Sequence, residues 1–420
     1  MDDFKRTLER NLGRSEHYVA DTAAPVALDE YVRLVAFYLP QFHRIPENDK
    51  WWGAGFTEWT NVTKALPRFS GHYQPHLPEG LGFYDLKNIE TLREQAALAR
   101  RYGIEGFCFH YYWFSGRELL ESPIKALLRN PEIDIKFCLN WANESWCRSW
   151  DGRESEVLVK QNYGPGDDRS FAVDLLQYVR DRRYIRIGNR PLVMIYRPKD
   201  IPNAREMIEV VREVFRSDGE ENPYIAMVQS FGDRDPAVYG MDGAIEFPPH
   251  KVGTSIPDIN GELQTFDSDY SGVVFRYDDI VRASTVQEDT AYRVFKGVCP
   301  AWDNTARKAK NGHTYAESTP EKYGRWLEMA CRQTIAKHPP EERLVFINAW
   351  NEWAEGAHLE PDRHFGWAYL AETRNVHTRL QQKTEAIYSE AVRINPWNKF
   401  RFKAKRALRR IWASFLGGKD

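Results

Sequence analysis

Two glutamates, Glu352 and Glu355, lie three residues apart in the segment Trp-Asn-Glu-Trp-Ala-Glu. Breaking a glycosidic bond requires one group that protonates the leaving oxygen and a second that assists attack at the anomeric carbon. A pair of carboxyl groups does both when its surroundings separate the two pKa values. In a turn this spacing brings the two side chains to one side, and a separation of about 5 Å suits a retaining mechanism.

The tryptophans beside the pair, Trp350 and Trp353, are expected to form apolar walls that raise the carboxyl pKa values by desolvation. In the alternative interpretation, Glu355 starts a helix, where the helix dipole favours an acidic side chain, and Glu352 is a solvated surface charge. Two glutamates at this spacing are common. The elements around them must therefore decide between the two interpretations.

Eight apolar runs rich in β-forming residues predict the strands that would position this pair. They are residues 32–39, 104–112, 135–141, 192–196, 224–229, 243–247, 293–302 and 344–350. Helical patterns separate most of them, and strands alternating with helices predict a parallel sheet with right-handed crossovers. Eight such units favour a (β/α)₈ barrel with long βα loops, a TIM barrel of the α/β class, whose active site lies where the strands end.

The predicted strand ends and the loops behind them bring aromatic and polar side chains to one rim. The candidate substrate-binding residues there are Tyr38, Gln41, Glu58, Trp59, His110, Tyr112, Asn140, Trp141, Glu144, Trp302, Asp303, Asn351 and Trp353. Aromatic rings cover the C–H faces of sugars while polar neighbours take the hydroxyl groups, so this set favours a carbohydrate site. Each residue could instead be a core or loop anchor. The spacing of the histidines, among them His72 and His76, matches no standard ligand set, and no metal or cofactor is expected.

The composition supports a large core rich in aromatic residues. The 420 residues have a formal net charge of -2, which argues against a polyanion partner, and 14% of them are aromatic. The five cysteines form no Cys-x-x-Cys pattern, and no disulfide is expected. The N-terminus shows no apolar stretch typical of a signal peptide, and no run of about twenty apolar residues would span a bilayer. We therefore expect a reduced, cytoplasmic protein.

The ends of the chain differ from the predicted barrel, which we place at residues 31–385. Residues 1–30 are polar and weakly helical and are expected to form an appendage, and residues 386–420 a basic amphipathic tail. Between Arg393 and Asp420, nine lysines and arginines accompany a single acid and alternate with tryptophan, phenylalanine and leucine. This pattern is typical of a membrane-surface helix. We expect residues 393–416 to bind the inner membrane peripherally rather than pack on the barrel or bind nucleic acid.

Two long segments resemble the WbsX-like proteins. The first runs from Phe37-Tyr38-Leu39-Pro40-Gln41-Phe42-His43 to Thr57-Glu58-Trp59-Thr60-Asn61-Val62, and the second from Trp350 to Glu355, Gly356 and on to Leu359-Glu360-Pro361-Asp362. The resemblance covers roughly residues 31 to 385. These proteins are encoded in bacterial O-antigen and capsule clusters, have often been labelled glycosyltransferases, and are related to glycoside hydrolase family 99, the endo-α-1,2-mannosidases.

The resemblance implies unequal roles for the two glutamates. The related hydrolases are metal-independent retaining barrels with an Asn-Glu-Trp-x-Glu segment after the last strand. By position, Glu352 matches the base that deprotonates the sugar 2-hydroxyl for attack within the substrate, and Glu355 matches the general acid/base. Ala354 occupies a position that is often histidine in the mannosidases, so the resemblance does not imply specificity for mannose.

Three functions remain open at this stage. The first is a retaining glycoside hydrolase or transglycosylase that acts on an α-linked bacterial surface polysaccharide or a lipid-linked glycan. The second is a glycosyltransferase in O-antigen or capsule assembly, for which Asp267-Ser268-Asp269 offers the Asp-x-Asp pattern of a metal site. The third is a glycan-binding protein without catalytic activity, which would be insensitive to changes at Glu352 and Glu355.

Overall fold

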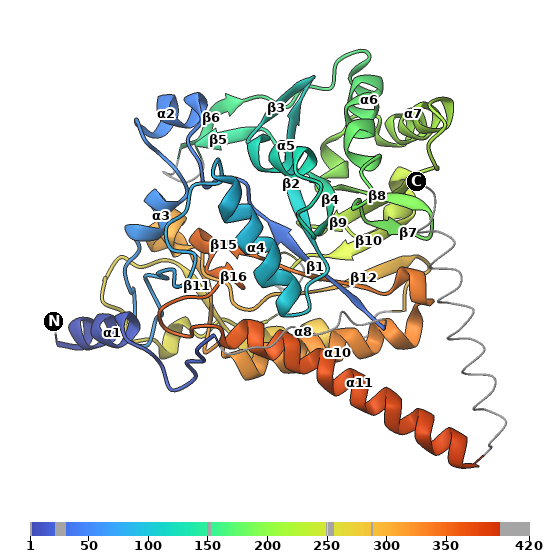
Figure 1. Ribbon diagram of the computed structural model, residues 1–420. Helices are drawn as coiled ribbons and strands as arrows, with labels where there is room; N and C mark the ends of the chain where they lie inside the picture. Colours follow the sequence, from blue (N-terminus) through green and yellow to red (C-terminus); the bar gives the residue numbers. More distant parts are fainter. Residues whose placement is uncertain are drawn as a thin grey trace. The chain divides into compact units, whose positions relative to one another are not determined.

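The centre of the molecule is a closed barrel of eight parallel strands (Figure 1). The computed structural model describes residues 2–21, 31–148, 153–248, 250, 256–286 and 289–394. The barrel strands are β1 (Arg33–Tyr38), β2 (Gly106–Phe114), β4 (Lys136–Trp141), β8 (Arg190–Ile195), β9 (Tyr224–Gln229), β10 (Gly243–Glu246), β12 (Arg293–Val298) and β14 (Leu344–Ile347). The barrel closes because β1 pairs in parallel with both β14 and β2. This confirms the predicted (β/α)₈ fold.

The barrel strands are buried on both faces, as parallel strands covered by helices must be. Every residue of β9 and of β14 is buried, and apolar side chains occupy nearly all of their positions. Each observed strand lies within, or overlaps most of, one of the eight apolar runs in the sequence. The continuous apolar character of these runs was therefore a sufficient signal for the barrel.

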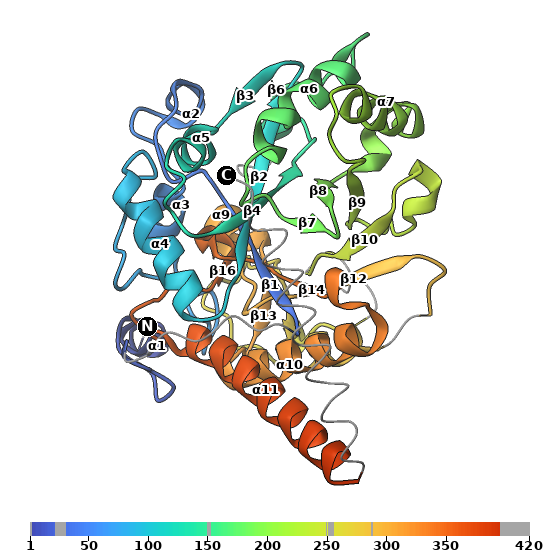
Figure 2. The ribbon, with the colours of Figure 1, turned by 45° about the vertical axis from the view of Figure 1, so that its right-hand side comes forward.

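Helices cover the outside of the strands, and the two views show them around the barrel (Figures 1 and 2). They are α4 (Ile89–Arg101), α5 (Ser122–Arg129), α6 (Asp167–Val179), α7 (Ala204–Ser217), α8 (Tyr277–Thr285) and α10 (Pro320–Lys337). Helix α11 (Ala368–Ile394) follows the last barrel strand. In α7, for example, Met207, Ile208, Val211, Val214 and Phe215 recur at helical spacing and are buried.

Shorter elements fill the loops between the barrel strands and helices. They include α2 (Pro46–Trp52), α3 (Trp59–Thr63) and α9 (Thr305–Lys308), the strand β3 (Arg117–Leu119), which pairs with β2, and β7 (Arg186–Ile187), which pairs with β8. Three further two-stranded sheets are β5 (Trp146–Arg148) with β6 (Arg153–Val159), β11 (Val273–Arg276) with β13 (His313–Ala316), and β15 (Asn351–Glu352) with β16 (Ala357–His358). The 3₁₀ turn η7 (Trp353–Glu355) connects the last pair. Three of these elements, α3, α9 and η7, are in mutual contact.

Helix α8 lies in the long polar stretch between the predicted strands 243–247 and 293–302. Its buried positions are Tyr277, Ile280 and Ser284, and the Tyr277 hydroxyl donates a hydrogen bond to the Cys299 carbonyl at 2.6 Å. Aspartates and an arginine occupy the other face. The apolar face of this nine-residue helix is too narrow to raise the average hydropathy of the stretch, so the helix escaped prediction.

The described residues up to Arg374 form one compact unit, and those from Asn375 belong to a second. Helix α1 (Asp2–Leu12) is part of the first unit, where the Asn11 amide donates to the carbonyl oxygens of His72 and Gln74 at 2.7 and 2.9 Å. The described residues end at 394. The predicted membrane-binding segment, 393–416, therefore lies outside them from residue 395 onward. Among the described helices, none combines the length and the apolar character needed to cross a bilayer.

Candidate active site

The loop that follows β14 presents Glu352 and Glu355 on a tight turn between β15 and β16. Gly356 ends the turn with a φ of 59°, a left-handed conformation that favours glycine. A Cβ atom at this position would lie 3.0 Å from the Cβ atom of Asp303. The amide of Asp303 also donates to the carbonyl of Glu355 at 2.6 Å. The turn is thereby held against the loop that follows β12.

Arg307 joins three glutamates from distant parts of the chain. Its Nε atom donates to Oε1 of Glu58 at 2.7 Å, Nη1 contacts Oε1 of Glu355 at 2.5 Å, and Nη2 contacts Oε2 of Glu352 at 3.1 Å. Arg307 lies in α9 and Glu58 directly precedes α3, so the contact of α3, α9 and η7 brings these side chains together. The guanidinium group holds the carboxylates of Glu352 and Glu355 side by side, because its planar fork has a donor for each.

Burial dominates the electrostatics of this cluster. It raises the pKa of Glu352 to about 8, with the charge of Glu355 as the next cause, and Arg307 opposes the shift. Burial also raises the pKa of Glu355, again against Arg307. Burial disfavours the charge of Arg307 itself, but Glu58 and the other two carboxylates outweigh it and hold its pKa well above its usual range. The carboxyl pair therefore retains a proton at neutral pH.

A cavity of about 350 Å³ lies in front of the pair. Seven of the predicted site residues line it, namely Gln41, His110, Tyr112, Glu144, Trp302, Glu352 and Glu355. Nε2 of His110 lies 3.8 Å from Oε1 of Glu352, and burial lowers the pKa of His110 to about 4, so this imidazole is neutral. Aromatic side chains and polar or charged side chains both contribute to the lining of this concave cavity, a combination found at small-molecule sites.

Eight predicted site residues do not line the cavity: Tyr38, Glu58, Trp59, Asn140, Trp141, Asp303, Asn351 and Trp353. Glu58 acts on the pair through Arg307, and Asn140 lies 3.4 Å from Nδ1 of His110. Asp303 is buried and paired with His72, whose Nε2 is 2.6 Å from Oδ2. The remaining aromatic residues pack in the interior, as does Asn351, whose side-chain amide bonds the backbone of Leu39, directly after β1.

The apolar walls expected from Trp350 and Trp353 are not part of the cavity lining. Both side chains are fully buried, and the Trp353 indole donates to Oε2 of Glu360 at 2.7 Å while its ring stacks on His358. These partners hold the Trp353 ring within the interior of the loop. Tyr112, Trp146 and Trp302 provide the aromatic surface of the cavity instead.

Sequence reasoning missed several residues of the site. The cavity is also lined by Trp52, Trp146, Phe231, His250, Arg307 and Lys308, and by Tyr196 at the end of the predicted strand 192–196. The hydroxyl of Tyr196 lies 3.1 Å from Nδ1 of His250, and burial lowers the pKa of His250 to about 4. Trp52 could have been selected from the motif that starts the barrel. Arg307 gave no signal, because a single arginine in a short polar loop is ordinary.

Comparison with solved structures finds the same barrel fold in proteins of low sequence identity. The GH99 endo-α-mannosidase from Bacteroides thetaiotaomicron superposes with a TM-score of 0.53 and 14% identity, over 86% of this chain and 100% of that chain. The same enzyme in complex with Bis-Tris propane gives a TM-score of 0.52 and 15% identity, with the same coverage. A glycoside hydrolase-like protein gives 0.54 and 14%, over 86% of this chain and 98% of that chain.

The chain belongs to the family described as Glycosyltransferase WbsX, whose model matches residues 34–373. This confirms the family indicated by the two sequence motifs. Among curated relatives, the WxcX protein of Xanthomonas campestris pv. campestris strain B100 is 44% identical over 368 residues, which are 88% of this chain and 52% of that protein. WxcX of strain ATCC 33913 is 44% identical over 356 residues, 85% of this chain and 51% of that protein. The chain thus spans about half the length of these relatives.

Proposed function

We propose that this chain is a carbohydrate-active enzyme that breaks an α-glycosidic bond with retention of configuration, using Glu352 and Glu355. The observation on which the proposal rests is the pair itself: both carboxyl groups line one cavity at the end of the barrel, share Arg307 and have raised pKa values. Two buried carboxyl groups with one proton between them form an acid and a base in contact with the same substrate. A bacterial surface polysaccharide or a lipid-linked glycan is the proposed substrate class.

In the first step, Glu352 accepts the proton of the sugar 2-hydroxyl group as that oxygen attacks the anomeric carbon. The bond to the leaving oxygen breaks, and Glu355 donates its proton to that oxygen. The products are a 1,2-anhydro sugar and a released alcohol, with Glu352 now protonated and Glu355 ionised. This assignment follows the WbsX-like resemblance, and the geometry supports it because Arg307 holds both carboxyl groups against the cavity.

In the second step, Glu355 takes a proton from water or from an acceptor hydroxyl group, whose oxygen attacks the anomeric carbon. The strained ring opens and Glu352 returns its proton to the 2-oxygen, which restores the starting state. Two inversions at the same carbon retain the configuration. Attack by water gives hydrolysis, and attack by a sugar hydroxyl gives transfer.

The protonation state of the free protein fits a cycle of this kind. At neutral pH the raised pKa of Glu352 leaves one proton on the pair. The net charge is the same whichever carboxyl group holds that proton. A substrate hydroxyl hydrogen-bonded to Glu352 favours its ionised form, which places the proton on Glu355, where the leaving oxygen needs it.

Transfer from a nucleotide sugar is the second candidate, because the family description names a glycosyltransferase. Its predicted metal motif is engaged elsewhere: Asp267 pairs with Arg68 at 3.0 Å, Asp269 pairs with Lys310, and neither aspartate lines the cavity. A transglycosylase that uses the glutamate pair would unite the family description with the hydrolase fold.

The test compares two kinds of glycosyl donor, oligosaccharides and nucleotide sugars. The full chain is incubated with defined α-linked oligosaccharides and, separately, with a panel of nucleotide sugars plus Mn²⁺ and an acceptor glycan, and products are followed by mass spectrometry. We expect cleavage or transfer from an oligosaccharide donor without a nucleotide. Turnover confined to a nucleotide sugar, undiminished in Glu352→Gln, would contradict the proposal.

A further inference from the structure

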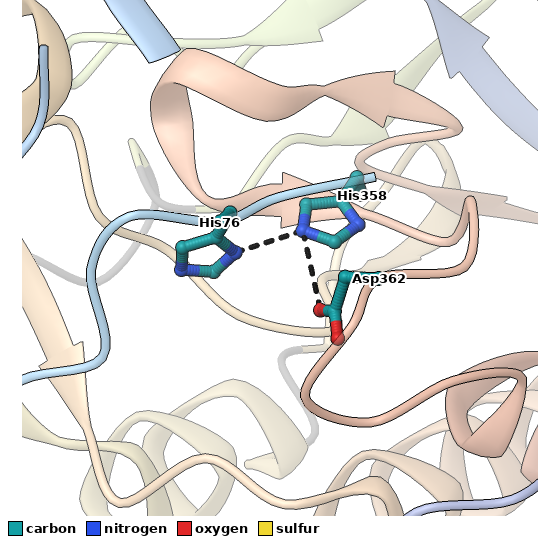
Figure 3. A group of neighbouring side chains, drawn as sticks. All are labelled: His76, His358 and Asp362. Carbon is teal, nitrogen blue, oxygen red and sulfur yellow. Dashed lines mark hydrogen bonds and ion pairs between the residues drawn. The ribbon is translucent and has the colours of Figure 1, made fainter. Parts of the chain in front are cut away.

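A second cluster of polar side chains lies outside the lining of the cavity that contains the glutamate pair (Figure 3). It consists of His76, from the long loop after β1, His358 of β16, and Asp362 in the turn before α11. One potential ligand atom from each lies within 4.8 Å of the others, and all three residues are buried. Figure 3 shows the His76 ring and the Asp362 carboxylate both directed toward the same nitrogen of His358.

Neighbouring backbone groups orient two of these three side chains. Nδ1 of His358 lies 2.9 Å from the carbonyl oxygen of Glu360, which can only accept, so Nδ1 carries the hydrogen and Nε2 has a free lone pair. In Asp362, Oδ1 accepts the amide hydrogens of His364 and Phe365 at 2.8 and 2.6 Å. These bonds direct Oδ2 toward His358. Backbone carbonyls that set the tautomer of a histidine are typical of the surroundings of a metal site.

In the structure a hydrogen bond occupies the place between the two imidazoles, and the carboxylate lies beside it. Nδ1 of His76 lies 2.8 Å from Nε2 of His358 and can donate one hydrogen to it. Oδ2 of Asp362 lies 3.7 Å from the same nitrogen, and both atoms are acceptors. The distance is too long for a hydrogen bond, although the Tyr73 hydroxyl also bonds to this carboxyl group. A cation that replaces the hydrogen shared by the two imidazoles would be held by both nitrogens and by this carboxylate oxygen.

The donor set and the space beside it match a particular class of ion. Two imidazoles and a carboxylate select a divalent transition metal rather than Mg²⁺ or Ca²⁺, which prefer oxygen ligands. All three residues line a cavity of about 400 Å³, which leaves room for a water molecule or another ligand as the fourth partner. Tetrahedral ligands at metal distances of about 2.0–2.1 Å are about 3.3 Å apart. The two nitrogens would therefore separate by about half an ångström.

We propose that His76, His358 and Asp362 bind a divalent transition-metal ion of the zinc type. The site does not depend on the proposed glycosidic chemistry. Its place in the fold gives it a positioning role, because His358 and Asp362 follow Glu355 in the same loop and the His358 ring stacks on Trp353 at 3.8 Å. His76 belongs to the long loop that also contains Glu58. The ion would join the two loops that supply the carboxylate cluster.

The test measures metal binding by the full chain, first stripped with a chelator. Zinc affinity is determined by competition with a chromophoric chelator, and metal content by mass spectrometry after gel filtration. We expect about one zinc ion per chain, and Co²⁺ should give the intense visible bands of a four-coordinate site. His358→Gln and Asp362→Asn should each weaken zinc binding by at least about 100-fold, and zinc should raise the Tm of the wild type but not of these two variants.

His364→Gln is the matched control, because His364 lines the same cavity but lies outside the cluster and bonds the Gly13 carbonyl. This variant should keep the zinc affinity of the wild type. The proposal would be overturned if the wild type bound zinc no more tightly than Asp362→Asn does. An equal loss of zinc affinity in His364→Gln would also overturn it. If a cluster variant fails to fold, the wild-type chain alone still tests the proposal. A wild-type Co²⁺ spectrum with only weak six-coordinate bands, together with a Tm that zinc leaves unchanged, would also overturn the proposal.

Discussion

Three glutamates lie within nine residues of one loop, and their surroundings differ. Glu352 and Glu355 line the cavity and share the cationic Arg307. Glu360 faces the interior, where it accepts hydrogen bonds from the neutral groups of Trp353, Tyr84 and Gln95 at 2.7, 2.8 and 2.6 Å. Burial raises the pKa of Glu360 to about 7, close to the value of about 8 for Glu352.

The comparison shows that a raised pKa alone does not identify a catalytic carboxyl group. Glu352 and Glu360 are shifted in the same direction by the same cause, but only Glu352 has access to a cavity and a partner that can share its charge. The neutral donors around Glu360 use its oxygens and leave none for a substrate. Access to the cavity and the type of partner therefore distinguish the proposed catalytic carboxylate, Glu352, from the enclosed Glu360. The following changes test that distinction.

The largest expected difference is in catalytic rate. Glu352→Gln should lower kcat by about 10³–10⁴-fold, because it removes the base without a change in volume. Glu360→Gln, a change of the same chemical type eight positions along the chain, should stay within about tenfold of the wild type. Both rates are measured on the same α-linked oligosaccharide. Equal losses in the two variants would remove the distinction drawn between the two glutamates.

The next effect concerns stability and tests the cationic partner of the glutamates, Arg307, separately from the neutral partners of Glu360. Arg307→Met leaves Glu58, Glu352 and Glu355 buried without a cation, and should lower the free energy of unfolding by about 3–5 kcal/mol. Chemical denaturation at neutral pH measures this difference. Arg307→Lys should recover only part of it, because one ammonium group cannot contact three carboxylates in the geometry of the guanidinium fork. A variant Arg307→Met as stable as the wild type would show that the cluster is not held by this charge.

Glu360→Gln should have a smaller effect on stability. The amide replaces one acceptor oxygen with a donor, so at least one of the three neutral donors loses its partner in the interior. A loss of about 1–3 kcal/mol in the free energy of unfolding is expected. A gain in stability, measured by the same denaturation experiment, would indicate that Glu360 is ionised and unfavourable in the folded protein.

The last of these tests concerns the pH dependence of stability. The folded-state pKa of Glu352 is about 8, above its ordinary value of 4.5, so the folded protein binds a proton that the unfolded chain releases. This contribution to stability is complete below pH 4.5 and is lost as the pH rises toward 8. Glu352→Gln should therefore show a flatter decline in unfolding free energy between pH 4.5 and 8. Parallel curves for the two proteins would contradict the raised pKa.

The sequence was sufficient for the barrel, because eight continuous apolar runs leave few alternatives to a closed parallel sheet. It also indicated the glutamate pair and much of the cavity, since the ends of parallel strands must meet at one rim. It could not reveal Arg307 or the convergence of His76 with His358. These residues lie 45 and 282 positions from their partners, and loop packing, which has no periodic signal, brings them together.

The residue types and their spacing also could not show which glutamate is the acid and which is the base. The turn at Gly356 and the packing of η7 against α9 decide which carboxyl groups reach the cavity and which are enclosed. Trp353 illustrates the limit. Because Trp353 lies between the two glutamates in the sequence, it was predicted to form a wall of the site. In the structure its indole N–H instead donates to the buried carboxyl group of Glu360.

The most direct test of the central claim follows Glu355→Gln on two substrates with the same α-linked sugar. One is an oligosaccharide, whose leaving group needs a proton, and the other is an aryl glycoside, whose leaving group does not. NMR records the first-formed anomer of the wild-type product and the rates of both proteins. We predict an α product, a loss of at least about 10³-fold on the oligosaccharide and a much smaller loss of the first step on the aryl glycoside. A β product, or a Glu355→Gln rate equal to that of the wild type on the oligosaccharide, would contradict the account.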